Sequence, residues 1–86
     1  MNQTKTEIAA AFGRALKEAR ANVKMSQEAL ALESGIDRTF VSMLERGVRQ
    51  PALSTVFALS TALSIKPGVL VDRAAALMKL SYRRGG

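Results

Sequence analysis

The 86-residue sequence contains neither cysteine nor histidine. Without cysteine there is no disulfide, thiolate metal site or cysteine nucleophile, so stability must come from packing. Without histidine the chain also lacks the commonest general base and metal ligand. No pair of carboxylates has a catalytic spacing, and we interpret Glu28 and Glu33 as solvated positions on a helix. We therefore expect no enzyme, no metal and no cofactor.

Long hydrophobic runs are also missing. No apolar segment approaches the roughly 18 to 20 residues of a membrane span. The N-terminal segment has no continuous apolar stretch of the kind that secretory signals contain. These features predict a cytoplasmic protein without a membrane partner. Residues 8–21 also fit an amphipathic membrane-surface helix, but Glu18 and the need to pack the following helices favour a core role.

The charge balance is strongly positive. Thirteen Lys and Arg against seven Asp and Glu give a formal net charge of +6, which favours a polyanionic partner. The length predicts one domain over residues 1–80, followed by a frayed tail at 81–86. This leaves no room for a ligand-binding module, so we expect no small-molecule ligand.

Helical periodicity dominates the sequence, and no segment alternates with period two for long enough to form a strand. We therefore predict an all-α fold with five helices. They are expected at about residues 6–22, 27–34, 38–46, 53–63 and 67–80. The predicted buried positions around the first helix are Ile8, Phe12, Leu16, Ala19 and Val23, and those of the fourth are Val56, Phe57, Leu59, Ala62 and Leu63.

The segment 27–46, QEALALESGIDRTFVSMLER, has the pattern of a helix-turn-helix. Gly35 can take a positive φ and end the first of its helices. Asp37 can cap the second helix and leave Arg38 and Thr39 exposed in its first turn, which is the part that such a motif presents to bases in the major groove. The apolar wedge between the two helices is expected from Leu30, Ile36, Val41 and Leu44. A helical hairpin that only builds a core has similar apolar spacing.

Three further residues mark helix ends. Ser26 is a candidate N-cap for the helix that begins at Gln27. Gly47 is expected in a left-handed conformation after the helix that begins at Arg38. Pro67 fits the first turn of the last helix, where its missing N–H costs nothing.

Three segments, FGRALKEAR, KMSQEALALESGIDRTFVSMLERG and the LSTVFALSTALSI helix after Pro51, together resemble a known family. This is the Xre-type helix-turn-helix domain of the repressor and Cro proteins of lambdoid phages. The sequence is also similar to the controller proteins of restriction-modification systems. The resemblance runs from about Phe12 to Leu70. It implies a lambda-repressor-like DNA-binding domain of five helices, in which helices two and three form the helix-turn-helix.

The resemblance also implies a role for individual residues. Those expected to face bases are Arg38, Thr39, Ser42 and Met43. Those expected to contact the DNA backbone are Gln27, Phe40, Arg46, Arg49 and Gln50. Arg20 and Glu45 match a partly buried ion pair that joins the first helix to the third.

The sequence departs from the family pattern at four positions. Lys24 and Ser64 stand where the family usually has glycine, so we expect both at positive φ. Ala52 replaces the usual capping Ser of the fourth helix. Met43 replaces a polar base-facing residue, which suggests a hydrophobic contact there.

The favoured function is a sequence-specific transcriptional regulator, most simply a repressor, that binds double-stranded palindromic DNA as a homodimer and is encoded by a bacterium or phage. The alternative is an antitoxin that neutralises a toxin protein and regulates its own operon, although such a protein needs a longer segment to wrap its partner. The fifth helix has more apolar residues than a small core needs, which makes it the candidate dimer interface. Its apolar positions are Leu70, Val71, Ala74, Leu77, Met78 and Leu80. The other interpretation is that they only close the core of the monomer.

Overall fold

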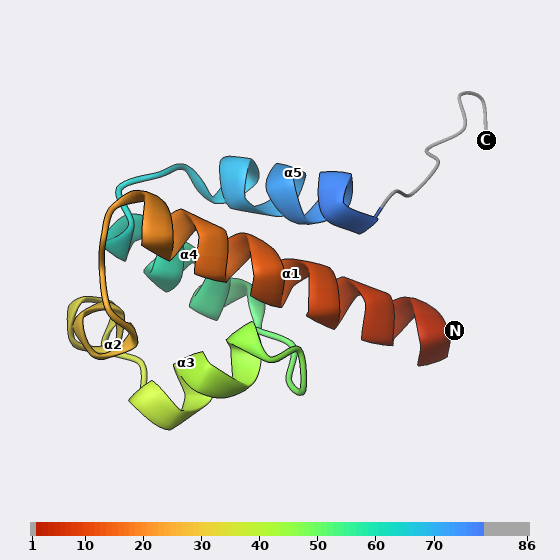
Figure 1. The fold of residues 1–86 in the computed structure, drawn as a ribbon, viewed down its shortest axis with the longest axis horizontal. Coiled ribbons are helices and arrows are strands. Elements are labelled where there is room, and N and C mark those ends of the chain that lie inside the picture. Colours follow the sequence, from red (N-terminus) through yellow and green to blue (C-terminus); the bar gives the residue numbers. More distant parts are fainter. Residues whose placement is uncertain (1, 79–86) are drawn as a thin grey trace.

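A computed structural model describes residues 2–78 of the chain, with side chains from residue 5 onward. Over this range the chain forms five helices and no strand (Figure 1), which confirms the predicted all-α fold. The helices are α1 (Asn2–Asn22), α2 (Gln27–Ser34), α3 (Arg38–Glu45), α4 (Leu53–Ala62) and α5 (Pro67–Met78). The predicted tail at 81–86 and Leu80 lie outside the described residues.

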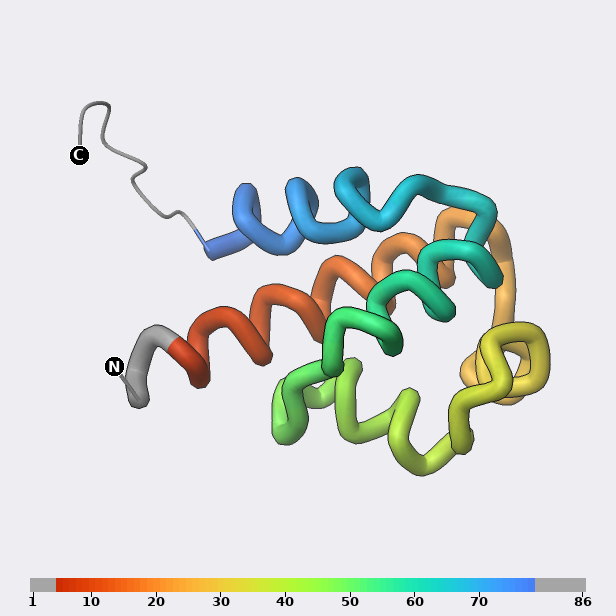
Figure 2. The backbone as a smooth tube through the Cα atoms, turned by 180° about the vertical axis from the view of Figure 1, so that it is seen from behind, coloured from red at the N-terminus to blue at the C-terminus, as the bar shows by residue number. Residues whose placement is uncertain are grey.

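The long helix α1 lies between α5 on one side and α3 on the other (Figures 1 and 2). Seen from behind, α4 crosses in front of α1 and joins α5 through a short turn (Figure 2). α2 follows α1 and packs against both α3 and α4. As a result α3 lies at the edge of the molecule, with no other described helix outside it.

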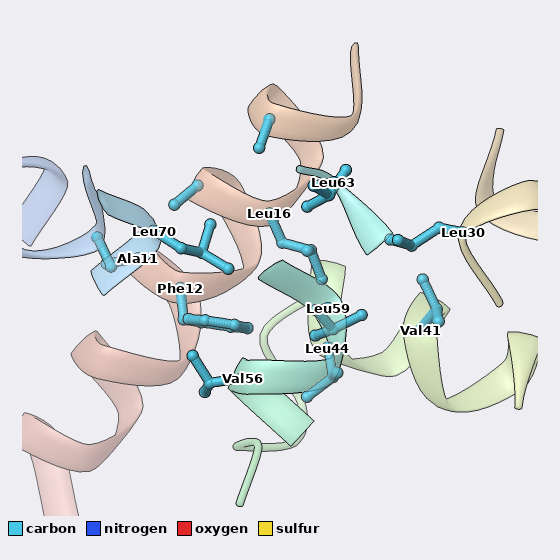
Figure 3. Close-up of a cluster of buried hydrophobic side chains, with 13 residues drawn as sticks. Ala11, Phe12, Leu16, Leu30, Val41, Leu44, Val56, Leu59, Leu63 and Leu70 are labelled. Atoms are coloured by element: carbon cyan, nitrogen blue, oxygen red, sulfur yellow. The ribbon is translucent and has the colours of Figure 1, made fainter. Parts of the chain in front are cut away.

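One hydrophobic core connects all five helices (Figure 3). The predicted wedge of the helix-turn-helix is confirmed, because Leu30, Val41 and Leu44 are fully buried and Ile36 packs against the same cluster. Full burial of a side chain of this size contributes about 1.5–3 kcal/mol. The core members are Ala11, Phe12, Ala15, Leu16, Ala19, Leu30, Val41, Leu44, Val56, Leu59, Leu63, Leu70 and Ala74.

The predicted caps are confirmed at both helices of the motif. The Ser26 hydroxyl accepts from the Ala29 amide at 3.0 Å at the start of α2. The Asp37 carboxylate accepts from the Thr39 amide at 3.0 Å at the start of α3. Gly35 ends α2 with a φ of 74°, and Gly47 follows α3 with a φ of 76°. Each cap satisfies amides or carbonyls that a helix end leaves without a partner.

The departures from the family pattern have the expected local consequences. Lys24 and Ser64 both adopt positive φ, at 57° and 59°, which is costly for a residue with a Cβ. Ala52 precedes α4 and makes no side-chain cap hydrogen bond. Lys24 and Ser64 lie in turns, and Ala52 lies directly before α4.

Three residues predicted to be buried are instead exposed: Ile8 by 39%, Val23 by 47% and Phe57 by 53%. Ile8 lies beside the inward row that Ala9, Phe12 and Leu16 form, and Val23 lies just beyond the end of α1. Phe57 follows Val56, which faces inward, and is therefore rotated by about 100° from it. Ser60 of the same helix is fully buried, and its hydroxyl has no hydrogen-bond partner within the described part of the chain.

Within residues 2–78 no single helix is both long and apolar enough to cross a membrane. α4 and α5 together have the length and composition of a broken span, with a bend of 107° between them. Leu59 of α4 and Leu70 of α5 are buried in the core, as is Leu63 directly after α4.

α1 and α3 approach each other closely at Gly13 of α1. A Cβ at this position would overlap the carbonyl oxygen of Leu44 and would lie 2.6 Å from that of Glu45. Only a residue without a side chain allows the end of α3 to lie this close to α1. Gly13 therefore sets the spacing between α1 and α3.

Replacing Gly13 by Ala is expected to lower the free energy of unfolding by about 1–3 kcal/mol or more, because backbone must shift to admit the methyl group. Gly68→Ala is the matched control, because a Cβ on that helical residue meets nothing within 4 Å. It should raise stability by about 0.5–1 kcal/mol through its helix propensity. Urea unfolding of both variants tests this, and equal stability of the two would contradict it.

Candidate nucleic-acid interface

The first turn of α3 lies at the surface of the helix-turn-helix. Arg38 and Thr39 are both exposed, and the Asp37 cap fixes the direction in which the helix begins. Within the described residues Arg38 makes no ion pair or hydrogen bond. The structure thus presents an unpaired guanidinium and a hydroxyl at an edge of the molecule, as the sequence predicts.

The remaining predicted contacts on α3 are less exposed. Ser42 and Met43 are partly buried, and the Ser42 hydroxyl accepts a long hydrogen bond from Arg46 Nε at 3.4 Å. Phe40, predicted to contact the DNA backbone, is half-buried and packs against the core. The aromatic ring therefore helps to seat α3, and only part of it is available to a ligand.

The loop between α3 and α4 extends the basic surface. Arg46, Arg49 and Gln50 are all exposed. Arg46 and Arg49 have no acidic partner in the part of the chain that the structure describes. The Gln50 carboxamide donates a long hydrogen bond of 3.5 Å to the Lys5 carbonyl of α1. The two arginines are thus free to bind an anion, while Gln50 also links the loop to α1.

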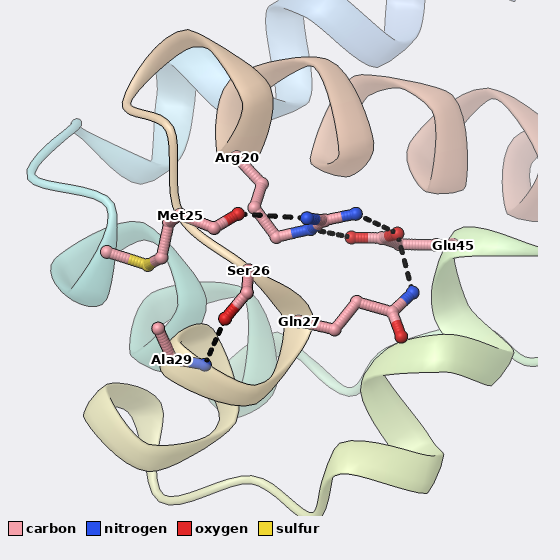
Figure 4. A network of polar contacts seen from close by, with 6 residues as sticks. All are labelled: Arg20, Met25, Ser26, Gln27, Ala29 and Glu45. Atoms are coloured by element: carbon pink, nitrogen blue, oxygen red, sulfur yellow. Dashed lines mark hydrogen bonds and ion pairs between the residues drawn. The ribbon is translucent and has the colours of Figure 1, made fainter.

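Gln27 has a role that sequence reasoning missed. Its Nε2 donates to Glu45 Oε1 at 2.9 Å, so the carboxamide expected on a phosphate is held by α3 instead (Figure 4). The backbone at the start of α2 keeps its ability to bind an anion, since the first amides of a helix have no carbonyl one turn earlier. Any phosphate contact at this position therefore falls mainly to the helix terminus.

The predicted ion pair between α1 and α3 is present. Arg20 donates to Glu45 through Nε at 2.7 Å and through Nη2 at 2.9 Å, in a bidentate arrangement (Figure 4). Arg20 Nη1 also donates to the Met25 carbonyl at 2.9 Å. The Glu45 side chain is 3% exposed and that of Arg20 is 16% exposed. The Glu45 carboxylate thus connects α3 to α1 and α2, and Arg20 also bonds to the turn that follows α1.

The environment of Glu45 keeps it ionised. Burial by itself raises the pKa of the Glu45 carboxyl, but hydrogen bonds from Arg20 and Gln27 and the charges of Arg20 and Lys17 outweigh it. The net result is a pKa below the ordinary value for a glutamate. The Glu45 hydrogen bond in turn raises the pKa of Arg20, against an opposing effect of burial. The pair is charged at neutral pH, and its geometry gives it a structural role.

The candidate dimer surface on α5 divides into two parts. Leu70 and Ala74 are buried within the core of the single chain, so they close that core. Val71 is 48% exposed, and Leu77 and Met78 are half-buried. Val71 and the exposed Ile8 line one apolar groove of about 180 Å³, whose other walls are Phe12, Gln50, Pro51, Val56 and Ala74.

Among the described residues, no three Asp or Glu side chains lie close enough together to hold a metal ion. The surface around α3 carries cations, hydroxyls and helix amides, which are groups that bind phosphate.

Comparisons with known proteins agree with this geometry. The helix-turn-helix family matches residues 16–70. The control protein C.BamHI of Bacillus amyloliquefaciens is 39% identical over 62 residues, which cover 71% of this chain and 76% of that protein. The crystal structure of the restriction-modification controller protein C.AhdI from Aeromonas hydrophila is 44% identical, with a TM-score of 0.71, and the match covers 72% of this chain and 94% of that one.

A third structure shares the fold at lower identity. It is the restriction-modification controller protein C.Esp1396I, crystallised as a tetramer in complex with its natural 35-base-pair operator. It is 24% identical, with a TM-score of 0.75, and the match covers 83% of this chain and 93% of that one. The five-helix arrangement is therefore one that other proteins also adopt.

Replacing Glu45 by Ala is expected to lower the free energy of unfolding at pH 7 by about 3 kcal/mol, the low end for a broken buried ion pair, because Arg20 is left without its partner. Because the pKa of Glu45 is lowered in the folded state, the ionised carboxylate stabilises the fold fully at pH values above the ordinary pKa of 4.5. This stabilisation is lost as the pH falls through the pKa of the folded state. Urea unfolding at neutral and acidic pH should therefore show that the difference in unfolding free energy between the wild type and Glu45→Ala decreases as the pH is lowered.

The matched control is Glu18→Ala. It breaks the Arg14–Glu18 pair, which spans 3.9 Å between side chains that are 64% and 55% exposed. This change should cost less than about 1 kcal/mol. If the two variants lose a similar free energy of unfolding, the buried pair does not hold α3. The same conclusion follows if the loss for Glu45→Ala does not vary with pH.

Proposed function

The chain belongs to the Xre-type helix-turn-helix family, which includes restriction-modification controller proteins, and on that premise we propose that it is a sequence-specific DNA-binding transcriptional regulator. The observation that carries the proposal is the exposed, unpaired first turn of α3 on a protein with a net charge of +6. The relatives named above as control or controller proteins support it, as does the operator complex of the similarly folded C.Esp1396I. Its place of action would be the bacterial cytoplasm, on nucleoid DNA.

Base recognition falls to the exposed face of α3. Arg38 has the fork of donors that pairs with O6 and N7 of guanine in the major groove. Thr39 and Ser42 can bond to base edges, and Met43 can contact a thymine methyl group. Arg38 supplies the strongest single discrimination, since a good bidentate pair is worth about 1–3 kcal/mol against the wrong base.

Backbone contacts on both sides would hold α3 in register. The amide end of α2 binds one phosphate, and Arg46 and Arg49 bind others beyond the opposite end of α3. Phe40, Gln27 and Gln50 contribute mainly by holding these elements in place, because each is engaged with another part of the chain. Such contacts position the protein and carry no sequence information directly.

The proposed regulator acts as a homodimer on a palindromic operator. One helix of eight residues reads few base pairs, so specific affinity requires two copies. The part of the candidate interface that the core does not bury is apolar, with Val71 exposed and Leu77 and Met78 half-buried. The exposed Ile8 lines the same groove as Val71. Repression follows if the bound dimer blocks a promoter, and the concentration of the protein then sets how strongly transcription is repressed.

Replacing Arg38 by Ala should weaken binding to the operator by about 1–3 kcal/mol for each half-site and relax the preference at one base pair. Titration of operator and random duplexes by fluorescence anisotropy measures both effects. The control is Arg73→Ala, which also removes one positive charge but lies on α5 and not on α3. It should leave the preference for operator over random DNA unchanged. An equal loss on operator and random DNA would make Arg38 a phosphate contact and would contradict its role in reading bases.

Replacing Val71 by Lys should yield a folded monomer, because a charge cannot be buried without a partner in the apolar interface. Ala76→Lys is the control, since this exposed residue lies about 140° around the same helix. Sedimentation should show the Val71 variant as a monomer with weakened operator binding and retained salt-sensitive binding to random DNA. A Val71 variant that stays dimeric would place the interface elsewhere.

A further inference from the structure

The N-terminal turns of α1 form a cleft with the loop that follows α3. The cleft has a volume of about 310 Å³. Lys5, Thr6 and Ala9 contribute one wall and residues 47–50 the other. Two segments far apart in the sequence are thus brought together beside the surface proposed to face DNA (Figure 1).

The cleft carries charge of one sign. Lys5 and Arg49 lie on its rim, both are exposed, and neither has a partner among the side chains that the structure describes. None of the seven acidic residues lines the cleft. The nearest in sequence, Glu7, lines a different depression, with Leu77 and Met78 of α5. Two unpaired cations at one cleft without an acid favour an anionic ligand.

The position of Lys5 relative to the loop is fixed by packing. A Cβ at Gly47 would lie 3.0 Å from the Cα of Ala10, so the loop backbone rests directly on α1. The Gln50 carboxamide adds its long hydrogen bond to the Lys5 carbonyl. Lys5 lies little more than one helical turn before Ala10. The backbone that carries the Lys5 side chain is therefore held in place relative to the loop.

We propose that Lys5 and Arg49 together bind a DNA phosphate that lies outside the bases read by α3. Lys5 is the new element, because it extends the interface from the helix-turn-helix to α1. The inference rests on the proposed function, since the ligand is the backbone of the same duplex. The clamp adds affinity and fixes where the flanking strand runs, without adding sequence preference of its own.

The test combines a variant with two lengths of DNA. Lys5→Gln removes the charge and keeps most of the side-chain length, and Lys66→Gln, in the turn between α4 and α5, is the matched control. Each protein is titrated at several salt concentrations with a long operator duplex and with a duplex trimmed to the recognised half-sites. Thermal unfolding checks that both variants keep the stability of the wild type.

On the long duplex, Lys5→Gln should make the slope of log affinity against log salt shallower by about 0.9 for each bound copy, the value for one lost phosphate contact. On the trimmed duplex the same variant should match the wild type, since the flanking phosphate is gone. Lys66→Gln should match the wild type on both. Arg49→Gln should reproduce the loss on the long duplex.

Three results would overturn the inference. If the salt dependence of Lys5→Gln on the long duplex equals that of the wild type, Lys5 does not contact DNA. The proposed function would be unaffected by that result. If Lys5→Gln and Lys66→Gln lose the same affinity for the long duplex, the loss reflects the lower net charge of the protein and not a contact at Lys5. A loss for Lys5→Gln on the trimmed duplex as large as that on the long duplex would show that Lys5 does not bind a flanking phosphate.

A wild-type protein without any preference for an operator is a different result. It would overturn the proposed function itself, and this inference with it.

Discussion

The carboxylate of Glu45 receives hydrogen bonds from Arg20 of α1 and from Gln27 of α2 while it is almost completely buried. It belongs to the last residue of α3, so this network fixes the C-terminal end of that helix relative to two others. Gly13 allows the same end to lie against the α1 backbone. Losing one partner of a buried, hydrogen-bonded pair leaves the other unpaired at a high cost. The position of α3, and hence the direction of its free end, depends on this attachment.

The two ends of α3 thus have different tasks. The C-terminal end is held by charge and close packing, and Val41 and Leu44 are fully buried in the core. The N-terminal end is capped by Asp37 and is otherwise exposed, with Arg38 unpaired within the described residues. A rigid attachment at one end means that α3 itself need not become ordered when Arg38 binds. The loop after α3 continues the basic surface through Arg46 and Arg49 toward Lys5 on α1.

Local signals in the sequence were sufficient for most of the fold. Ser26, Gly35 and Asp37 mark helix ends through chemistry within a few residues, and the positive φ of Lys24 and Ser64 follows from the family pattern. The inward face of α4 was assigned wrongly at Phe57, because a helix that is apolar on several sides does not reveal its orientation. The roles of Gly13 and Gln27 depend on contacts across 31 and 18 positions in the chain, which spacing within one helix cannot show. The glycine in the resembling segment FGRALKEAR was the one available signal for the contact with α3.

In the proposed regulator, a fixed α3 presents its first turn to the bases of a two-fold symmetric site. The most direct test is selection of duplexes bound by the wild-type protein from a random pool. We expect enrichment of an inverted repeat whose half-sites are related by the symmetry of the dimer. Their centres should lie about 34–36 Å apart, or a multiple of one helical turn. Enrichment of a single unrepeated site would contradict the dimer, and the absence of any enriched sequence would contradict the claim that α3 reads bases.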